Sequence, residues 1–263
     1  MHKPINILQL TDFHVFGNKQ TNLLNLNPYH TLVKTVEAVK NDCQKKNPAL
    51  ILLTGDLSQD FSLASYDVVK EVFATLNYPM AAIPGNHDDP NLFYDTLSGL
   101  CQKNFTFNNW RILLLDTCWP GHVSGFLSQN ELIFLEQSLA KDTQTPVLIF
   151  LHHHVLPVNS LWLDKIGLKN TPDFLEIIDQ YQHVRAVISG HVHQESLTQR
   201  NNVNFITTPS TSWQFARNSE PFRLDNLMPG YRWFELNNDN YKTYISRLEY
   251  NQNFVPDLDS KGY

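Results

Sequence analysis

Five short apolar segments recur along the chain, and each has the length of a buried β-strand. Segments with helical spacing of apolar residues or with helix-capping signals separate most of them. This alternation of strands and helices is typical of an α/β fold with a mostly parallel sheet. The five segments are Ile5–Leu10, Leu50–Leu53, Met80–Ile83, Val147–Leu151 and Ala186–Ser189.

Capping signals place the expected helices. Asn27-Pro28 combines an N-cap residue with proline at the first helical position. A second helix is expected over Ser62–Leu76, and Ser128 with Glu131 has the spacing of a capping box at the start of a third.

Hairpin signals add antiparallel strands to this pattern. Asn108-Asn109 lies between two strand-like segments, and after Val192 further turns are expected near Asn201-Asn202 and Asn237-Asn238. We therefore expect a mixed sheet or two sheets packed together.

Each of the five apolar segments runs directly into side chains that can bind a metal ion. The carboxyl ends of parallel strands form the ligand crevice of α/β folds, so these side chains should meet. Residues two apart in an extended segment point to the same side, so Asp12 and His14 would present two ligands to one place. The full set is Asp12 and His14, Asp56, Asn86 and His87, His152, and His191 and His193, with glycines before Asp56, Asn86 and His191 that allow tight turns and close backbone approach.

The chemistry of this set indicates two metal ions. Imidazole, carboxylate and amide oxygen without thiolate suit Mn, Fe, Zn or Co rather than an all-oxygen calcium site. Even without His87, the seven remaining side chains are too many for one tetrahedral zinc, which needs about four. They suit two metals about 3.5–4 Å apart, bridged by a carboxylate and a hydroxide.

Composition excludes several other classes. The net charge is −6 and no basic stripe runs along the chain, so we expect no nucleic-acid partner. No apolar stretch approaches about 20 residues, so no membrane span is expected. Cys43, Cys101 and Cys118 are widely spaced, which favours a reducing compartment. Because Met1-His2-Lys3-Pro4 leads straight into a strand, we expect no signal peptide and a cytoplasmic protein.

The ordered motifs resemble those of the calcineurin-like metallophosphoesterases, and within them the bacterial class III 3′,5′-cyclic-AMP phosphodiesterases. The likeness spans essentially the whole chain, with Val155 as a departure at a position where that branch usually has proline. Its motifs are Asp12-x-His14, Gly55-Asp56, Gly85-Asn86-His87-Asp88, "LHHHVLP", "SLWLD", "SGHVHQE", "TPSTSWQF" and the closing "FVPDLDSKGY".

The resemblance implies a four-layer α/β/β/α sandwich of two mixed β-sheets. It implies a single domain over residues 1–263, which includes the C-terminal hairpins from about residue 194. It also implies a monomer or homodimer, and two divalent ions per chain, Fe²⁺ or Mn²⁺. Carried over to this sequence, Asp12, His14 and His193 hold metal one, Asn86, His152 and His191 hold metal two, Asp56 bridges them, and the substrate meets His14, Asp56, Asn86, His87 and His193.

The implied activity is hydrolysis of 3′,5′-cyclic AMP to 5′-AMP by a bridging hydroxide activated by two metals. His87 is assigned to the leaving group, as proton donor or as a clamp on the phosphate. One alternative is the same chemistry on a glycerophosphodiester, a nucleotide pyrophosphate linkage or a phosphomonoester. Another is a non-catalytic nucleotide or metal sensor, against which the intact ligand set and His87 argue.

Several residues beside the candidate ligands are expected to have structural roles. His153 is expected to point away from the metals, and His154 to support the site or to line the substrate. Trp162 and Trp213 are interpreted as core residues, with a role in a nucleotide pocket as the alternative because they lie beside site motifs. The remaining residues are Asp60 and Asp88, either of which could orient His87, and Asp116, which is expected in a turn or cap.

Overall fold

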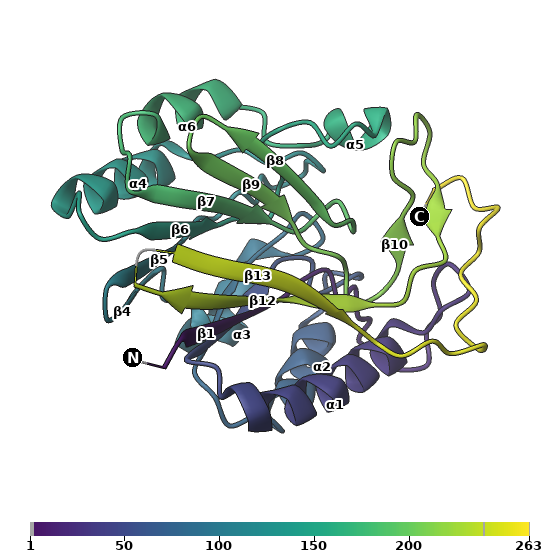
Figure 1. The fold of residues 1–263 in the computed structure, drawn as a ribbon. Helices are drawn as coiled ribbons and strands as arrows, with labels where there is room; N and C mark the ends of the chain where they lie inside the picture. Colours follow the sequence, from purple (N-terminus) through teal and green to yellow (C-terminus); the bar gives the residue numbers. More distant parts are fainter. Residues whose placement is uncertain (1–2, 239, 263) are drawn as a thin grey trace.

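A computed structural model describes residues 3–238 and 240–262. Two β-sheets face one another, and helices cover the outer face of each (Figure 1). Met1 and His2, on which the expectation of no signal peptide partly rests, lie outside the described residues. The first sheet has the order β13-β12-β1-β2-β3, with β1 (Ile5–Leu10), β2 (Leu50–Thr54), β3 (Met80–Ile83), β12 (Gly230–Asn237) and β13 (Asn240–Arg247).

The second sheet has six strands in the order β4-β5-β6-β7-β9-β8. Strands β5, β6, β7 and β9 pair in parallel, whereas β4 and β8 are antiparallel edges. The first sheet is also mixed, because β1 pairs in parallel with β2 and antiparallel with β12. The strands are β4 (Asn104–Phe107), β5 (Trp110–Leu114), β6 (Val147–Phe150), β7 (Val184–Ser189), β8 (Ser196–Arg200) and β9 (Val203–Thr207), with a separate pair β10 (Gln214–Phe215) and β11 (Leu224–Asp225).

The helices form the two outer layers. In Figure 1, α1 and α2 lie below the first sheet, and α4 and α6 lie above the second. The four-layer α/β/β/α arrangement of two mixed sheets is thus confirmed. The helices are α1 (Pro28–Lys46), α2 (Leu63–Phe73), α3 (Pro90–Leu97), the short 3₁₀ helix η1 (Ser98–Leu100), α4 (Gln129–Lys141), α5 (Leu161–Asp164) and α6 (Thr171–Ile178).

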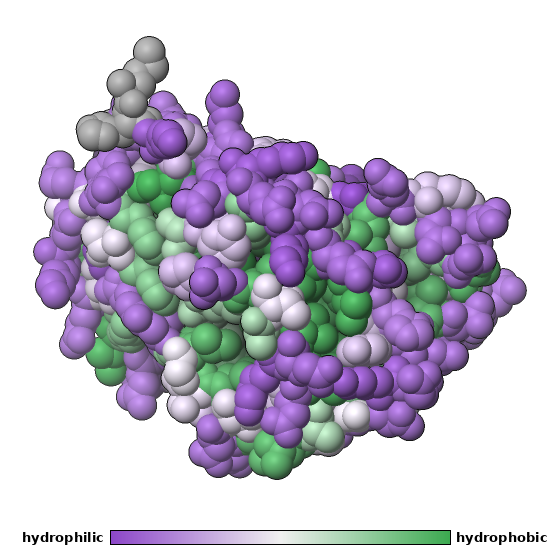
Figure 2. All heavy atoms as spheres, turned by 90° about the horizontal axis from the view of Figure 1, so that it is seen from below, coloured by the Kyte–Doolittle hydropathy of each residue, from purple (hydrophilic) through white to green (hydrophobic). Residues whose placement is uncertain are grey.

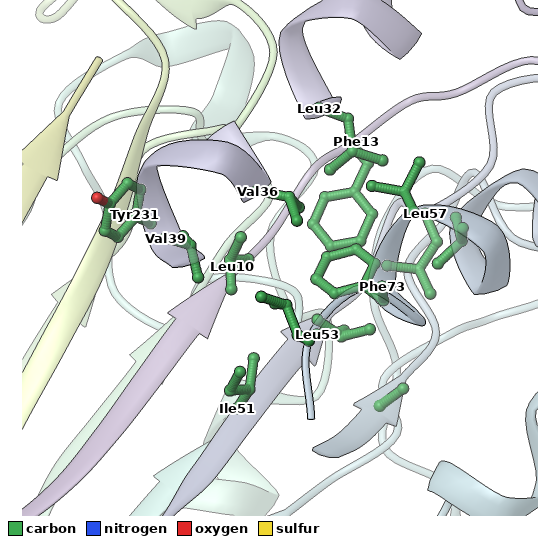
Figure 3. Packing of buried hydrophobic residues seen from close by; sticks show 14 of the residues in the cluster. Leu10, Phe13, Leu32, Val36, Val39, Ile51, Leu53, Leu57, Phe73 and Tyr231 are labelled. Atoms are coloured by element: carbon green, nitrogen blue, oxygen red, sulfur yellow. The ribbon is translucent and has the colours of Figure 1, made fainter. Parts of the chain in front are cut away.

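Strand alternation divides the hydrophobic core into layers. On β1, Ile7 packs between the sheets, whereas Leu8 and Leu10 face the helices. Both faces of the parallel strands are covered, which explains why these segments are apolar at consecutive positions. Figure 3 shows the helix-side cluster, where Phe13 stacks on Phe73 of α2 with ring centroids 5.3 Å apart.

Most of the expected local features are present. Asn27 caps α1 by accepting a 2.8 Å hydrogen bond from the His30 N–H. The hairpins form as expected, with β4 paired to β5, β8 to β9 and β12 to β13. The second helix is shorter than expected: α2 ends at Phe73, three residues before Leu76. Ser128 caps α4, but the Glu131 carboxylate accepts from the Asp116 N–H and pairs with Lys103.

On the face seen in Figure 2, hydrophobic side chains are interspersed among hydrophilic ones. Within residues 3–238 and 240–262, no helix has both the length and the apolar character needed to cross a bilayer.

Candidate metal centre

All eight side chains named from the sequence lie on loops that leave the carboxyl ends of β1, β2, β3, β6 and β7. The loops of both sheets meet, as expected for the carboxyl ends of parallel strands. Possible ligand atoms of all of these residues except Asn86, together with those of His153, form overlapping groups, each with all atoms within 4.8 Å of one another. The groups are Asp12, His14 and His193; Asp12, Asp56 and His152; His14, Asp56 and His87; and His152, His153 and His191.

Asp12, His14 and His193 form the first half of the centre. All three are fully buried. Nε2 of His193 lies 3.3 Å from Oδ1 of Asp12 and 3.1 Å from Nε2 of His14. Two imidazole nitrogens and a carboxylate oxygen that face one another at these distances are the donor set of a nitrogen- and oxygen-coordinated cation.

Asp56 lies between the two halves. Its Oδ2 is 3.3 Å from Nε2 of His152 and 3.7 Å from Nε2 of His14. Its Oδ1 accepts a 2.8 Å hydrogen bond from the backbone N–H of His87. This position between histidines of the two halves suits a carboxylate that bridges two cations.

The second half of the centre consists of Asn86, His152 and His191. It contains polar atoms that would be costly to bury without a bound cation. Among the described residues, Oδ1 of Asn86 and the Nε2 atoms of His152 and His191 are buried without a hydrogen-bond partner. Buried polar atoms are almost always satisfied. Three orphaned atoms of metal-binding type therefore fit a cation held by these residues.

The far ring nitrogens of three histidines are held by hydrogen bonds from neighbouring loops. Such contacts fix the ring and its tautomer, so that Nε2 faces the metal. The sequence analysis did not identify these partners, because two of them are backbone carbonyls. The pairs are His14 Nδ1 with Gln59 Oε1 at 2.7 Å, His152 Nδ1 with the Thr54 carbonyl at 2.8 Å, and His193 Nδ1 with the Trp213 carbonyl at 2.9 Å.

The backbone at Asp12 and His14 is not extended, contrary to the expectation. Both residues have left-handed conformations, with φ of 59° and 52°. The two side chains still converge because Phe13 between them is buried in the core. The loop after β7 repeats this arrangement, with φ of 65° at His191 and 45° at His193 around a buried Val192. Non-glycine residues rarely adopt positive φ, and such strain is typical of functional sites.

The glycines before Asp56 and Asn86 permit close packing at the centre. Gly55 has φ of +92°, and a Cβ atom there would collide with the His152 ring. A Cβ atom on Gly85 would collide with the Asp56 side chain. The expectation of close backbone approach is confirmed, and both glycines allow the loops of the two sheets to meet.

Burial and charge pairing oppose one another in the electrostatics of the centre. Burial alone would raise the pKa of Asp56, but His152, His87 and His14 around it hold that pKa well below its usual range. Burial lowers the pKa of His14 well below its usual value, against the attraction of Asp56. Burial also opposes protonation of His152, but Asp56 raises its pKa to about 9. A cation would take the place of that proton, because ligand imidazoles must be neutral.

The other two histidines of the run support the site. His153 packs against His191 with ring centroids 4.6 Å apart. Its Nδ1 lies 2.8 Å from Oγ1 of Thr117 and its Nε2 lies 3.1 Å from the Val123 carbonyl. Both ring nitrogens therefore have protein partners. His154 is buried, stacks on His191 at 5.8 Å, and has Nε2 3.8 Å from Oδ1 of Asp164.

The two tryptophans and three aspartates near the centre pack against, or hydrogen-bond to, other parts of the protein. Trp213 is fully buried and stacks on His14, and Trp162 packs against Phe215 and Phe222. Asp88 accepts hydrogen bonds from the backbone N–H groups of Gly85, Leu57 and Ser58, which fixes the loop that carries His87. Asp60 accepts from Gly17 and Ser62, and Asp116 accepts from Cys118 N–H in a turn, as expected.

Comparisons with known proteins identify the family of the chain. Residues 5–195 match the family model of the calcineurin-like phosphoesterases. A relative from Pseudomonas aeruginosa, named 3′,5′-cyclic adenosine monophosphate phosphodiesterase CpdA, is 37% identical over 260 residues, covering 98% of this chain and 94% of its own length. An Escherichia coli (strain K12) relative of the same name is 36% identical over 264 residues, with 98% and 95% covered.

A solved structure shares the fold. The dimetal phosphatase from Danio rerio has a TM-score of 0.66 at 16% identity, and the match covers 92% of this chain and 99% of that one. The resemblance inferred from the motifs is confirmed, and the chain belongs to the calcineurin-like phosphoesterase family.

Proposed function

We propose that the chain hydrolyses 3′,5′-cyclic AMP to 5′-AMP. The observation that carries the proposal is the position of Asp56, between His14 and His152 and bonded to the His87 backbone. This arrangement brings two groups of metal ligands and a candidate leaving-group residue to one place. The names of relatives that match 98% of the chain support the choice of a cyclic nucleotide as substrate.

The proposed ligands divide as the sequence implied. Metal one would be held by Asp12, His14 and His193, metal two by Asn86, His152 and His191, with Asp56 shared. The nitrogen- and oxygen-only donor set supports Fe²⁺ or Mn²⁺. Two such ions, when bound, would bring the pKa of a water molecule toward neutrality and offset charge that develops on the phosphoryl oxygens.

His87 is proposed to act on the leaving group. Its backbone is fixed by Asp56, and its ring lies edge-on to that of His14 with centroids 4.9 Å apart. It is less buried than the proposed histidine ligands, as a residue that meets substrate should be. In a 3′,5′-cyclic diester the leaving group is the ribose 3′-oxygen, to which His87 would give a proton or whose phosphate it would clamp.

The phosphate would lie among His14, Asp56, Asn86, His87 and His193. These residues surround the centre from loops of both sheets. The same metal chemistry can serve other diesters, so the substrate is the part of the proposal that most needs a direct measurement.

Metal-stripped protein refilled with Mn²⁺ or Fe²⁺ provides the test. It would be assayed on cyclic AMP, cyclic GMP and bis-p-nitrophenyl phosphate, with the products separated by chromatography. We expect metal-dependent formation of 5′-AMP. Formation of 3′-AMP would contradict the proposed leaving group. Turnover of the aryl diester with cyclic AMP untouched at millimolar concentration would contradict the substrate, and no metal-dependent turnover of any substrate would favour a sensor.

We propose a single domain, since side chains from both sheets share one core cluster. The cysteines Cys43, Cys101 and Cys118 are free, which supports a reducing, cytoplasmic location. We also propose a monomer or homodimer that binds neither nucleic acid nor membranes, in keeping with the net charge of −6.

A further inference from the structure

Phe61 is an aromatic residue with its side chain half in solvent beside the candidate metal centre. Its side chain is 48% exposed, although large apolar side chains are mostly buried in this fold. Its ring faces that of His87 with centroids 6.2 Å apart and an interplanar angle of 25°. Phe61 also has φ of 56°, a conformation that is unusual for a bulky residue.

The loop around Phe61 holds it in this conformation. Its backbone N–H donates to Oγ of Ser58 at 2.9 Å. On the next residue back, the carboxylate of Asp60 accepts from the Gly17 N–H at 2.9 Å and from the Ser62 hydroxyl at 2.7 Å. Strained backbone persists only where the surroundings determine it, so the ring is presented in a preorganised position.

The same short segment contacts the metal centre directly. Gln59, two residues before Phe61, holds Nδ1 of the proposed ligand His14 at 2.7 Å. The position of the Phe61 ring is therefore fixed relative to the place where a substrate phosphate would bind.

Three rings lie in sequence from the centre toward solvent. His14 is fully buried, His87 is partly buried, and Phe61 is the most exposed. Successive centroids are 4.9 Å and 6.2 Å apart. A cyclic nucleotide has the same order of parts: the phosphate, then the sugar, then a flat base. With the phosphate at His14 and His87, the base would extend toward Phe61.

Two other aromatic residues near the centre already have protein partners. Trp213 is fully buried and stacks on His14, so its face is not open to a base. Trp162 packs edge-on against Phe215 and Phe222. Exposure and position thus favour Phe61 over both tryptophans.

We propose that Phe61 is the platform on which the base of the nucleotide substrate stacks. This inference rests on the proposed function and adds a specificity-determining residue to it. Stacking on an aromatic ring is tolerant of base identity, because every base has a π-face. Phe61 would therefore distinguish a nucleotide from a diester without a base, and would contribute little to a choice between adenine and guanine.

The test compares two cyclic diesters that differ only in the base. Cyclic AMP is one, and the methyl riboside 3′,5′-cyclic phosphate, which has no base, is the other. Phe61→Leu keeps the apolar bulk and the backbone strain but removes the π-face. We expect it to lower kcat/KM for cyclic AMP by at least about five-fold, mainly through KM, and to leave the base-free diester unchanged. Cyclic GMP should lose as much as cyclic AMP.

Two further variants sharpen the comparison. Phe61→Tyr keeps an aromatic face at this position and should behave as the unmodified chain. Phe126→Leu changes another partly exposed phenylalanine, one that packs on Trp119, and should affect neither substrate.

An equal loss on both diesters in Phe61→Leu would make Phe61 a support for His87 and overturn the proposal, and so would no loss on cyclic AMP. Failure of the proposed function is distinguishable, since it would appear as absent cyclic AMP turnover in the unmodified chain.

Discussion

The backbone N–H of His87 donates a 2.8 Å hydrogen bond to Oδ1 of Asp56, so the residue proposed for the leaving group is attached to the carboxylate proposed to bridge the metals. The contact uses the backbone N–H of His87 and not its imidazole. It also means that the His87 side chain can be removed without removal of the hydrogen bond to Asp56.

His87→Ala should therefore retain two metals per chain. Its turnover of cyclic AMP should fall by about 10²–10⁴-fold, the usual contribution of a general acid. The loss on bis-p-nitrophenyl phosphate should be smaller, because p-nitrophenolate leaves without a proton. Elemental analysis and steady-state rates on the two substrates would test this, with the exposed His30→Ala as control. Metal depletion, or equal slowing on both substrates, would contradict the assigned role.

The adjacent histidines His152 and His153 should differ in their effect on metal content. His152→Ala removes the Nε2 that faces the proposed bridging carboxylate of Asp56 at 3.3 Å, so it should lose one metal and most activity. His153→Ala should keep both metals. It would cost about 1–3 kcal/mol of stability, because the Val123 carbonyl and the Thr117 hydroxyl would each lose a hydrogen bond to the ring.

Metal content per chain and urea unfolding of the two alanine variants would separate these effects. A fully active His152→Ala protein with two metals would rule out the ligand assignment. A metal-poor His153→Ala protein would show that His153 belongs to the coordination sphere.

Stability should depend on pH through His183, which precedes β7 and so lies at the opposite end of that strand from the proposed ligands His191 and His193. Burial, with Arg111 nearby, lowers the pKa of His183 in the folded chain. The unfolded chain therefore binds a proton more readily, so the contribution of His183 is complete above about pH 7 and is lost as pH falls through and below about 6.5.

His183→Gln should reduce the slope of unfolding free energy against pH by up to about 1.4 kcal/mol per pH unit over that range. Urea unfolding of metal-stripped protein between pH 5 and 8 would measure it, with His30→Gln as the matched substitution. A slope unchanged from that of the unmodified chain would show that His183 takes up a proton in the folded state.

The sequence indicated the strands and the candidate ligands because both depend on local properties. An apolar run such as Val147–Leu151 predicts a buried strand, and the donor that follows it falls at the strand end whatever the tertiary details. The end of α2 at Phe73 was harder to predict, since helix ends depend on packing and capping as well as on periodicity.

The backbone of the ligand loops could not be predicted by the same reasoning. Extended geometry was assumed for Asp12 and His14, yet both have positive φ. Burial of Phe13 in the helix-side core stabilises this conformation, and that core exists only once β1 and α2 have packed (Figure 3). Hydrogen-bond partners of the ligands, such as the Trp213 carbonyl, could not be predicted either, because a backbone group carries no sequence signal.

Gln59 is a side-chain partner of His14 that the sequence pattern did not predict. Its Oε1 accepts from Nδ1 of His14 and so directs Nε2 toward the centre. Gln59→Leu removes the acceptor and should weaken metal affinity by about 10–100-fold, the usual effect of losing such a partner. Gln59→Glu keeps an acceptor at the same place and should retain affinity. Chelator competition on both variants would decide, and equal affinities in the two would mean that packing alone orients His14.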